Sequence, residues 1–134
     1  MGGPPLEDDS TISDDAALWR RVYPLWIVRD ENAGGPRVSS AAFDDSEDGS
    51  PLSVLLADVV AKTQRTAQNV LAGYDGYALA AISAGTARHN KQSVARTPLP
   101  DEPAHASVFG TKTKSNKRGM AKAANWVIAP PEQT

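Results

Sequence analysis

Lysines and hydroxyl side chains alternate in the segment FGTKTKSNKRG (109–119), a composition suited to holding a phosphate group. A phosphate loop of the GxxxxGK[ST] kind needs a glycine directly before its lysine, so that backbone amides can turn toward the phosphate. Thr111 and Thr113 stand at that place before Lys112 and Lys114. Neither lysine fits the pattern, and the segment therefore does not predict nucleotide hydrolysis.

A simpler anion-binding surface remains in the same region. Five bases and no acids lie between His105 and Ile128. If Ser115 or a neighbouring threonine caps a helix from about residue 116, the amides and the positive dipole end of that helix face the same lysines. The residues that would contact a phosphate or a nucleic acid backbone are Lys112, Lys114, Lys117, Arg118 and Lys122. The alternative is that these bases form an ordinary solvated helix face.

The chain has two histidines, and one of them lies in a setting that could support catalysis. His89 belongs to the polar stretch ARHNKQ, where an exposed imidazole needs no further explanation. His105 follows the proline-rich loop PDEPAH and begins an expected strand. Asp101 could orient its imidazole, and Ser107, two residues further on the same strand face, could supply a hydroxyl. This set predicts a hydrolase or transferase centre, and the alternative is a strand-end histidine bonded to the backbone.

Two adjacent arginines, Arg20 and Arg21, lie among aromatic residues in ALWRRVYPLWIV (17–28). The expected role of these arginines is structural, either stacking on Trp19 or pairing with the acidic N-terminal residues. The alternative is an arginine that binds substrate.

Metal and cofactor sites are not predicted. The chain has no cysteine, which excludes disulfides, thiol nucleophiles and thiolate zinc sites. The acidic stretch DDSEDGS (44–50) has the glycine of a calcium loop, but with Asp44 at position 1 the closing glutamate of position 12 is replaced by Leu55. The paired acids of the chain fall in expected loops, where nothing raises the pKa of a carboxyl group for acid chemistry.

The net charge of −2 hides an uneven distribution. Residues 1–50 contain eleven acids and four bases, a net charge of −7, whereas residues 51–134 contain five acids and ten bases, a net charge of +5. Such halves are typical either of an interaction surface or of two ends of one fold whose charges partly cancel.

Alternating and helical patterns predict a chain of interleaved strands and helices. Residues 18–22 have the spacing of a helical turn, and Pro24 divides this run from a short buried strand. Helices are expected from about residue 56 to 71, with a break near Arg65 and a restart capped by Thr66, and at 114–125. The remaining expected strands are 25–28, 38–43, 51–57, 77–83, 93–96, 105–109 and 126–128. A competing interpretation makes 77–90 helical.

These elements predict an α+β fold, a single small domain with one mixed β-sheet and helices packed mainly on one face. Residues 1–14 are expected to be a disordered acidic tail, 15–129 the domain, and 130–134 a C-terminal tail. No stretch is long and apolar enough for a membrane span, and MGGPPLEDDS lacks the basic start and apolar core of a secretory signal, so a cytoplasmic location without a membrane partner is expected.

No complete catalytic or metal constellation is present, so the sequence favours a non-catalytic module over an enzyme. The leading hypothesis is a protein-interaction or accessory module of a bacterial cytoplasmic assembly, with another protein as its partner and no cofactor. The alternatives are nucleic-acid or phosphate binding through 112–122, and a small hydrolase or transferase centred on His105.

Overall fold

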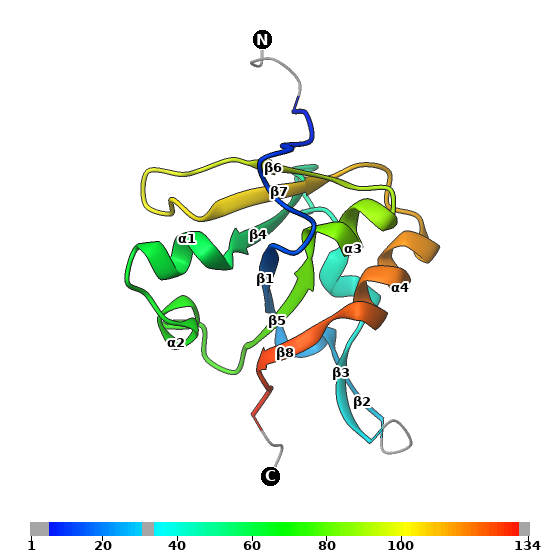
Figure 1. Ribbon diagram of the computed structural model, residues 1–134. Coiled ribbons are helices and arrows are strands. Elements are labelled where there is room, and N and C mark those ends of the chain that lie inside the picture. Colours follow the sequence, from blue (N-terminus) through cyan, green and yellow to red (C-terminus); the bar gives the residue numbers. More distant parts are fainter. Residues whose placement is uncertain (1–5, 31–33, 132–134) are drawn as a thin grey trace.

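Six strands form one antiparallel sheet in the computed structural model, which describes residues 6–30 and 34–131. Their spatial order is β6-β7-β4-β1-β5-β8 (Figure 1). A separate hairpin pairs β2 (Ile27–Asp30) with β3 (Gly35–Val38). The strands of the large sheet are β1 (Ala17–Val22), β4 (Leu52–Leu56), β5 (Ala78–Ser83), β6 (Ser93–Arg96), β7 (His105–Phe109) and β8 (Asn125–Ile128). The predicted small α+β domain is confirmed, but a sheet mixing parallel and antiparallel pairs is not, because each described pair is antiparallel.

Helices lie beside both faces of this sheet. Successive side chains of a strand point to opposite faces, and in β4 Val54 joins one hydrophobic cluster while Leu55 joins another. The first cluster includes residues of η3 (Ser40–Phe43), α3 (Ala84–His89) and α4 (Lys114–Ala123), and the second includes residues of α1 (Ala57–Lys62) and α2 (Ala67–Val70). Figure 1 shows α1 and α2 on one side of the central strands and α3 and α4 on the other. The expectation that helices pack mainly on one face is therefore not confirmed.

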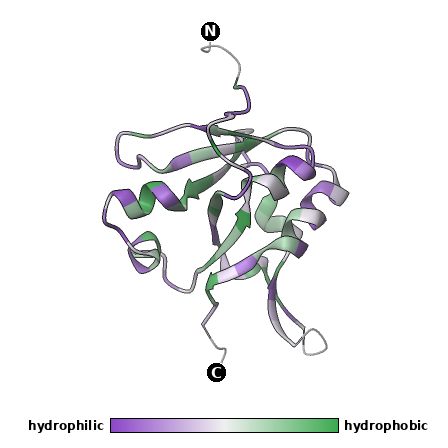
Figure 2. Cartoon of the chain, in the orientation of Figure 1, coloured by the Kyte–Doolittle hydropathy of each residue, from purple (hydrophilic) through white to green (hydrophobic). Residues whose placement is uncertain are grey.

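Hydropathy follows this layering. The central strands β4 and β5 are largely apolar in Figure 2, whereas α3 and α4 carry hydrophilic residues. In the described part of the chain, no helix has the length and apolar character needed to cross a membrane.

Threonine caps set two of the helix starts. Thr66 accepts a hydrogen bond from the amide of Asn69, whose side chain in turn accepts from Thr66. The predicted break near Arg65 and restart at Thr66 are confirmed. Thr113 and Asn116 form the same reciprocal arrangement at the start of α4, so the cap is a threonine neighbouring Ser115 and the helix begins at Lys114.

The helical turn expected at 18–22 is wrong, because these residues form β1. A spacing of four residues places two side chains on one face of a strand as well as of a helix. Leu18 and Val22 are fully buried on one face of the sheet, where β1 has strands on both sides. The strand expected at 25–28 begins only at Ile27, and Leu25 is exposed in the 3₁₀ turn η1 (Pro24–Trp26).

The segment 77–90 combines both interpretations of its sequence. The strand is confirmed as β5, which ends at Ser83. The hydroxyl of Ser83 then accepts a hydrogen bond from the amide of Thr86 at 3.0 Å, and this cap starts α3 where a turn was expected.

Residues 6–14, which the sequence assigns to the acidic tail, lie against the domain. Ile12 is 2% exposed and belongs to the main core cluster. The amide of Asp9 donates to the carbonyl oxygen of Val94 at 2.8 Å, and the carboxylate of Asp8 accepts from the amide of Val94 at 2.9 Å. One buried isoleucine and these bonds to β6 order the segment. Residues 1–5 and 132–134 of the expected tails lie outside the described residues.

Candidate functional site

Two of the five bases predicted to bind anions form ion pairs with carboxylates of the acidic loop 44–50. The Nζ atom of Lys112 lies 2.6 Å from a carboxylate oxygen of Asp45 and 3.0 Å from the carbonyl oxygen of Val108, and its side chain is 4% exposed. The Nζ atom of Lys117 lies 3.2 Å from the carboxylate of Asp44. These two lysines therefore hold the 44–50 loop against the domain.

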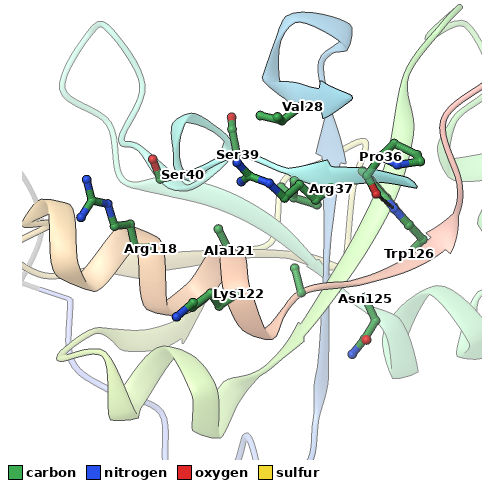
Figure 3. A pocket seen from close by; sticks show the side chains of 12 residues that line it. Val28, Pro36, Arg37, Ser39, Ser40, Arg118, Ala121, Lys122, Asn125 and Trp126 are labelled. Atoms are coloured by element: carbon green, nitrogen blue, oxygen red, sulfur yellow. Dashed lines mark hydrogen bonds between the residues drawn. The ribbon is translucent and has the colours of Figure 1, made fainter. Parts of the chain in front are cut away.

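The other predicted bases follow one stripe of α4, because Lys114, Arg118 and Lys122 are spaced four residues apart. Arg118 and Lys122 border a cavity of about 830 Å³ between α4 and the β2–β3 hairpin, where Arg37 joins them (Figure 3). We call this cavity the α4 groove. Its remaining lining residues are Val28, Pro36, Val38, Ser39, Ser40, Ala121, Ala124, Asn125 and Trp126. The three bases of the groove are solvated, since Arg37, Arg118 and Lys122 are exposed.

A smaller cavity, of about 250 Å³, lies where β1 and β4 separate. The two strands are paired only at Leu18 with Leu56 and at Trp19 with Leu55. Beyond these pairs the side chain of Arg20 links the two strands, because its Nη1 donates to the carbonyl oxygen of Ser53 at 3.0 Å. We call this cavity the arginine pocket. It is lined by Trp19, Arg20, Arg21, Trp26, Ser53, Val54, Leu55, Tyr74, Tyr77 and His105.

Arg20 is a largely buried cation held by carbonyl oxygens. Its Nε donates to Ala42 at 2.9 Å and its Nη1 to Ser53, while Nη2 donates to no other described residue. Among residues 6–30 and 34–131, no carboxylate lies within ion-pair distance of this guanidinium. Burial, with the like charge of Arg21, lowers the pKa of Arg20 to about 10. The protein therefore keeps a positive charge in a place that disfavours it.

Arg21 brings a second guanidinium to the same pocket. Its Nε donates to the carbonyl oxygen of Val70 at 2.8 Å, and its Cζ lies 4.3 Å from the ring centroid of Tyr74. The Cζ of Arg20 likewise lies 5.1 Å from the ring centroid of Trp26. The predicted aromatic stacking of these arginines thus involves Trp26 and Tyr74 instead of Trp19. The expected pairing with the N-terminal acids is wrong, because Asp8, Asp9 and Asp14 pair with Arg88 and Arg96.

A chain of edge-to-face aromatic contacts runs from Trp26, beside Arg20, to Tyr74, beside Arg21. Trp26 contacts Tyr23 at 5.7 Å between ring centroids, Tyr23 contacts Tyr77 at 5.6 Å, and Tyr77 contacts Tyr74 at 5.2 Å. The residues after β1, around η1 and before β5 supply these rings. The pocket therefore combines cations with aromatic surface, a combination suited to a planar anion.

His105 reaches into the arginine pocket and contacts a hydroxyl group there. Its Nε2 lies 3.1 Å from Oγ of Ser53, and its Nδ1 lies 2.9 Å from both the carbonyl oxygen and Oγ1 of Thr97. A carbonyl oxygen can only accept a hydrogen bond, so the Nδ1 atom that faces it carries the proton in the neutral ring. Nε2 is then the acceptor, and the Ser53 hydroxyl is its donor.

The predicted partners of His105 are not those that the structure brings together. Asp101 is exposed and makes no hydrogen bond to the described residues. Ser107 is buried and bonds to Oγ1 of Thr97 at 2.9 Å, one step removed from the imidazole. The hydroxyls at the ring are those of Thr97, at Nδ1, and of Ser53, at Nε2. Ser53 is the one polar residue in the apolar strand β4. That interruption is the only sequence signal for it, and the pairing of β4 with β7 was needed to connect it with His105.

A metal centre has no clustered ligands in the described residues, since no group of three histidines or carboxylates lies together there. Comparison with known proteins adds no further guide to the chemistry. No protein-family model, curated protein or solved structure matches this chain.

Proposed function

We propose that this protein binds an anionic group, a carboxylate or a phosphate, in the arginine pocket. The observation that supports this proposal is the guanidinium of Arg20, which is largely buried, is held by carbonyl oxygens alone and adjoins a second cation. Buried charges in proteins are normally paired, because removing an ion from water without a counter-charge is costly. A bound anion supplies that counter-charge.

The geometry also supports direct contact with the ligand. Nη2 of Arg20 and both Nη atoms of Arg21 make no hydrogen bonds to the described residues. Guanidinium groups bind carboxylates and phosphates through two parallel hydrogen bonds. An anion that accepts from these atoms would also favour the protonated form of Arg20 and so reverse the lowering of its pKa.

The size and walls of the pocket restrict the ligand. Its volume of about 250 Å³ lies just under the range of roughly 300–1,000 Å³ for sites of drug-sized ligands. Aromatic side chains line much of it. We therefore expect a ligand with one planar ring or a single acidic side chain, and not a dinucleotide.

The anionic group can belong to a free small molecule or to a partner protein. If a partner protein supplies it, the pocket receives an acidic side chain of that partner. This case agrees with the sequence-based hypothesis of a protein-interaction module in a bacterial cytoplasmic assembly. The larger α4 groove does not carry this proposal, because its bases are already exposed to water and gain less from a counter-charge.

Titration with matched small ligands tests the proposal. Benzoate and phenyl phosphate should shift the NMR signals of Arg20, Arg21 and Trp26 in a saturable way, whereas neutral benzamide should not. Arg21→Met should weaken benzoate binding by about tenfold, or about 1.4 kcal/mol, and Arg118→Met is the matched control outside the pocket. A peptide with an acidic side chain, set against its amide counterpart, tests the protein source.

Equal binding of benzoate and benzamide, or equal loss in both variants, would refute the proposal. Arg20→Met gives a second check on the role of the buried guanidinium. If Arg20 is a binding group, its removal abolishes benzoate binding while the protein still unfolds cooperatively in urea.

A second candidate function is polyanion binding along the α4 groove. The observation that favours it is Arg37, which comes from the hairpin and joins Arg118 and Lys122 at one cavity (Figure 3). Replacing Arg118 and Lys122 together with Gln should weaken binding of short single-stranded DNA and reduce its salt dependence by roughly one unit of slope per lost contact. Lys62→Gln on α1 is the control, and DNA binding that ignores the double replacement contradicts this candidate.

A further inference from the structure

We propose that Ser53 is a nucleophile with His105 as its general base, so that the arginine pocket hydrolyses small carboxylic esters that carry an anionic group. This inference rests on the proposed anion binding, because Arg20 and Arg21 would hold such a substrate. It replaces the set expected from the sequence, in which Asp101 and Ser107 accompany His105.

The antiparallel register brings the two groups together. Leu55 is paired with His105 and Ser53 with Ser107, so Ser53 and His105 are diagonal neighbours on one face of β4 and β7. Diagonal neighbours are within reach of a long side chain, and the imidazole spans the gap to place Nε2 3.1 Å from Oγ. Both residues line the cavity, so a ligand in the pocket adjoins them.

The proton arrangement has the direction that a nucleophile and its base require. Nδ1 donates to the carbonyl oxygen of Thr97 at 2.9 Å, which leaves the lone pair of Nε2 facing the Ser53 hydroxyl. Thr97 is fixed in turn, since its amide donates to the carbonyl oxygen of His105 at 3.1 Å. The backbone therefore orients the imidazole, a role that a carboxylate has in other serine hydrolases.

Positive charge lies on the same face of the sheet as the serine. Trp19 is paired with Leu55, so Arg21, two residues after Trp19, and Ser53, two residues before Leu55, project from that face, and both line the cavity. A cation near the reacting carbon stabilises the oxyanion of a tetrahedral intermediate.

The reaction balances with water as the only co-reactant. Oγ of Ser53 attacks the ester carbonyl carbon as its proton passes to Nε2 of His105, and collapse of the intermediate breaks the bond to the alkoxy group, which leaves as an alcohol with that proton. Water then attacks the acyl-serine, again giving a proton to Nε2. The carboxylic acid departs, and the proton returns to Oγ.

The test uses two esters of the same length, mono(4-nitrophenyl) glutarate and the neutral 4-nitrophenyl pentanoate, with release of nitrophenol measured by absorbance. We expect faster turnover of the anionic ester. Ser53→Ala and His105→Gln should each lower that rate by about 100-fold or more, whereas Ser107→Ala, which removes a hydroxyl one step away, should change it by less than about threefold. A fluorophosphonate should add its mass to Ser53, located by peptide mapping of the unaltered protein.

Benzoate titration of Ser53→Ala separates this inference from the proposed function. The catalytic role is overturned if the unaltered protein neither turns over the ester nor is labelled at Ser53. If benzoate still binds in that case, the anion site remains supported. Labelling of another residue also overturns the catalytic role. The ¹⁵N shifts of His105 provide a check that needs no variant, because a neutral ring protonated on Nε2 contradicts the proton arrangement.

Discussion

Arg20 and Arg65 are two arginines of one chain in opposite surroundings. Arg65 makes two hydrogen bonds to the carboxylate of Glu102, at 2.8 and 2.6 Å, and these bonds raise the pKa of the guanidinium. Arg20 has only carbonyl acceptors, and burial lowers its pKa to about 10. A carboxylate thus neutralises Arg65, and no described carboxylate does the same for Arg20.

The ion pair of Arg65 and Glu102 predicts a specific acid sensitivity. Hydrogen bonds from Arg65 hold the pKa of Glu102 below its ordinary value, against the effect of burial. A carboxyl group whose pKa is lowered by folding stabilises the folded state above its unfolded pKa, and this contribution is lost as the pH falls through the folded value. Glu102→Gln should lower the free energy of unfolding by about 1–2 kcal/mol at neutral pH.

Urea unfolding at neutral pH and near pH 3 measures this effect. The difference between the unaltered protein and Glu102→Gln should shrink at the lower pH, because the contribution of the carboxylate is lost progressively as the pH falls toward the lowered pKa of Glu102 in the folded chain. Asp101→Asn, at an exposed neighbour, should change stability at neither pH. A difference for Glu102→Gln that stays constant across the range would contradict the assignment.

At the scale of elements, the local signals predict much of the fold. Thr66 caps the second helix as its side-chain chemistry predicts, and residues 93–96 and 105–109 are the strands that their patterns indicate. Residues 18–22 were predicted wrongly, because two apolar side chains four apart satisfy both periods and only the flanking strands decide.

Gly119 shows a similar limit at the level of packing. A Cβ atom at this position would clash with Oδ1 of Asn90, so the glycine inside α4 permits the close approach of the Asn90 side chain at the end of α3. The sequence predicts a helix there but not this neighbour.

The candidate site was predicted only in part, for the same physical reason. His105 was identified, since a histidine at a strand end after a proline loop is visible in the sequence. Ser53 was not identified, because its contact with His105 depends on which strands pair and in what register. Arg20 was singled out in the sequence because of its aromatic neighbours, but its burial was not predicted. That burial depends on the separation of β1 from β4, which no local pattern encodes.

At the scale of the whole molecule, the unequal charges of the two halves of the sequence meet in the fold. Acids of residues 1–50 pair with bases of residues 51–134 in five described ion pairs. These pairs are Asp8 and Asp14 with Arg88, Asp9 with Arg96, Asp45 with Lys112, and Asp44 with Lys117. Much of the asymmetry is thus internal neutralisation, which weakens the case for a basic segment free to bind nucleic acid.

Two adjacent acids, Asp44 and Asp45, allow the contribution of these ion pairs to the free energy of unfolding to be measured. Asp45 pairs with Lys112, whose side chain is 4% exposed, whereas Asp44 pairs with Lys117, which is 19% exposed. Removing the partner of a buried charge costs about 3–5 kcal/mol, and a surface ion pair such as that of the exposed Asp44 contributes about 0–1 kcal/mol. Asp45→Asn should therefore lower the free energy of unfolding by about 3 kcal/mol, and Asp44→Asn by less than about 1 kcal/mol. Equal losses in urea unfolding would show that burial of the lysine does not set the energy.

The short ladder between β1 and β4 divides the sheet into two three-stranded halves, β6-β7-β4 and β1-β5-β8, joined by two residue pairs and by the side chain of Arg20. Any ligand that withdraws this guanidinium from the carbonyl oxygens of Ala42 and Ser53 loosens the seam as it fills the pocket. A ligand that accepts only from Nη2 leaves those two bonds in place and shares the guanidinium with the seam, so the middle of the sheet is the part of the molecule that we expect binding to affect first.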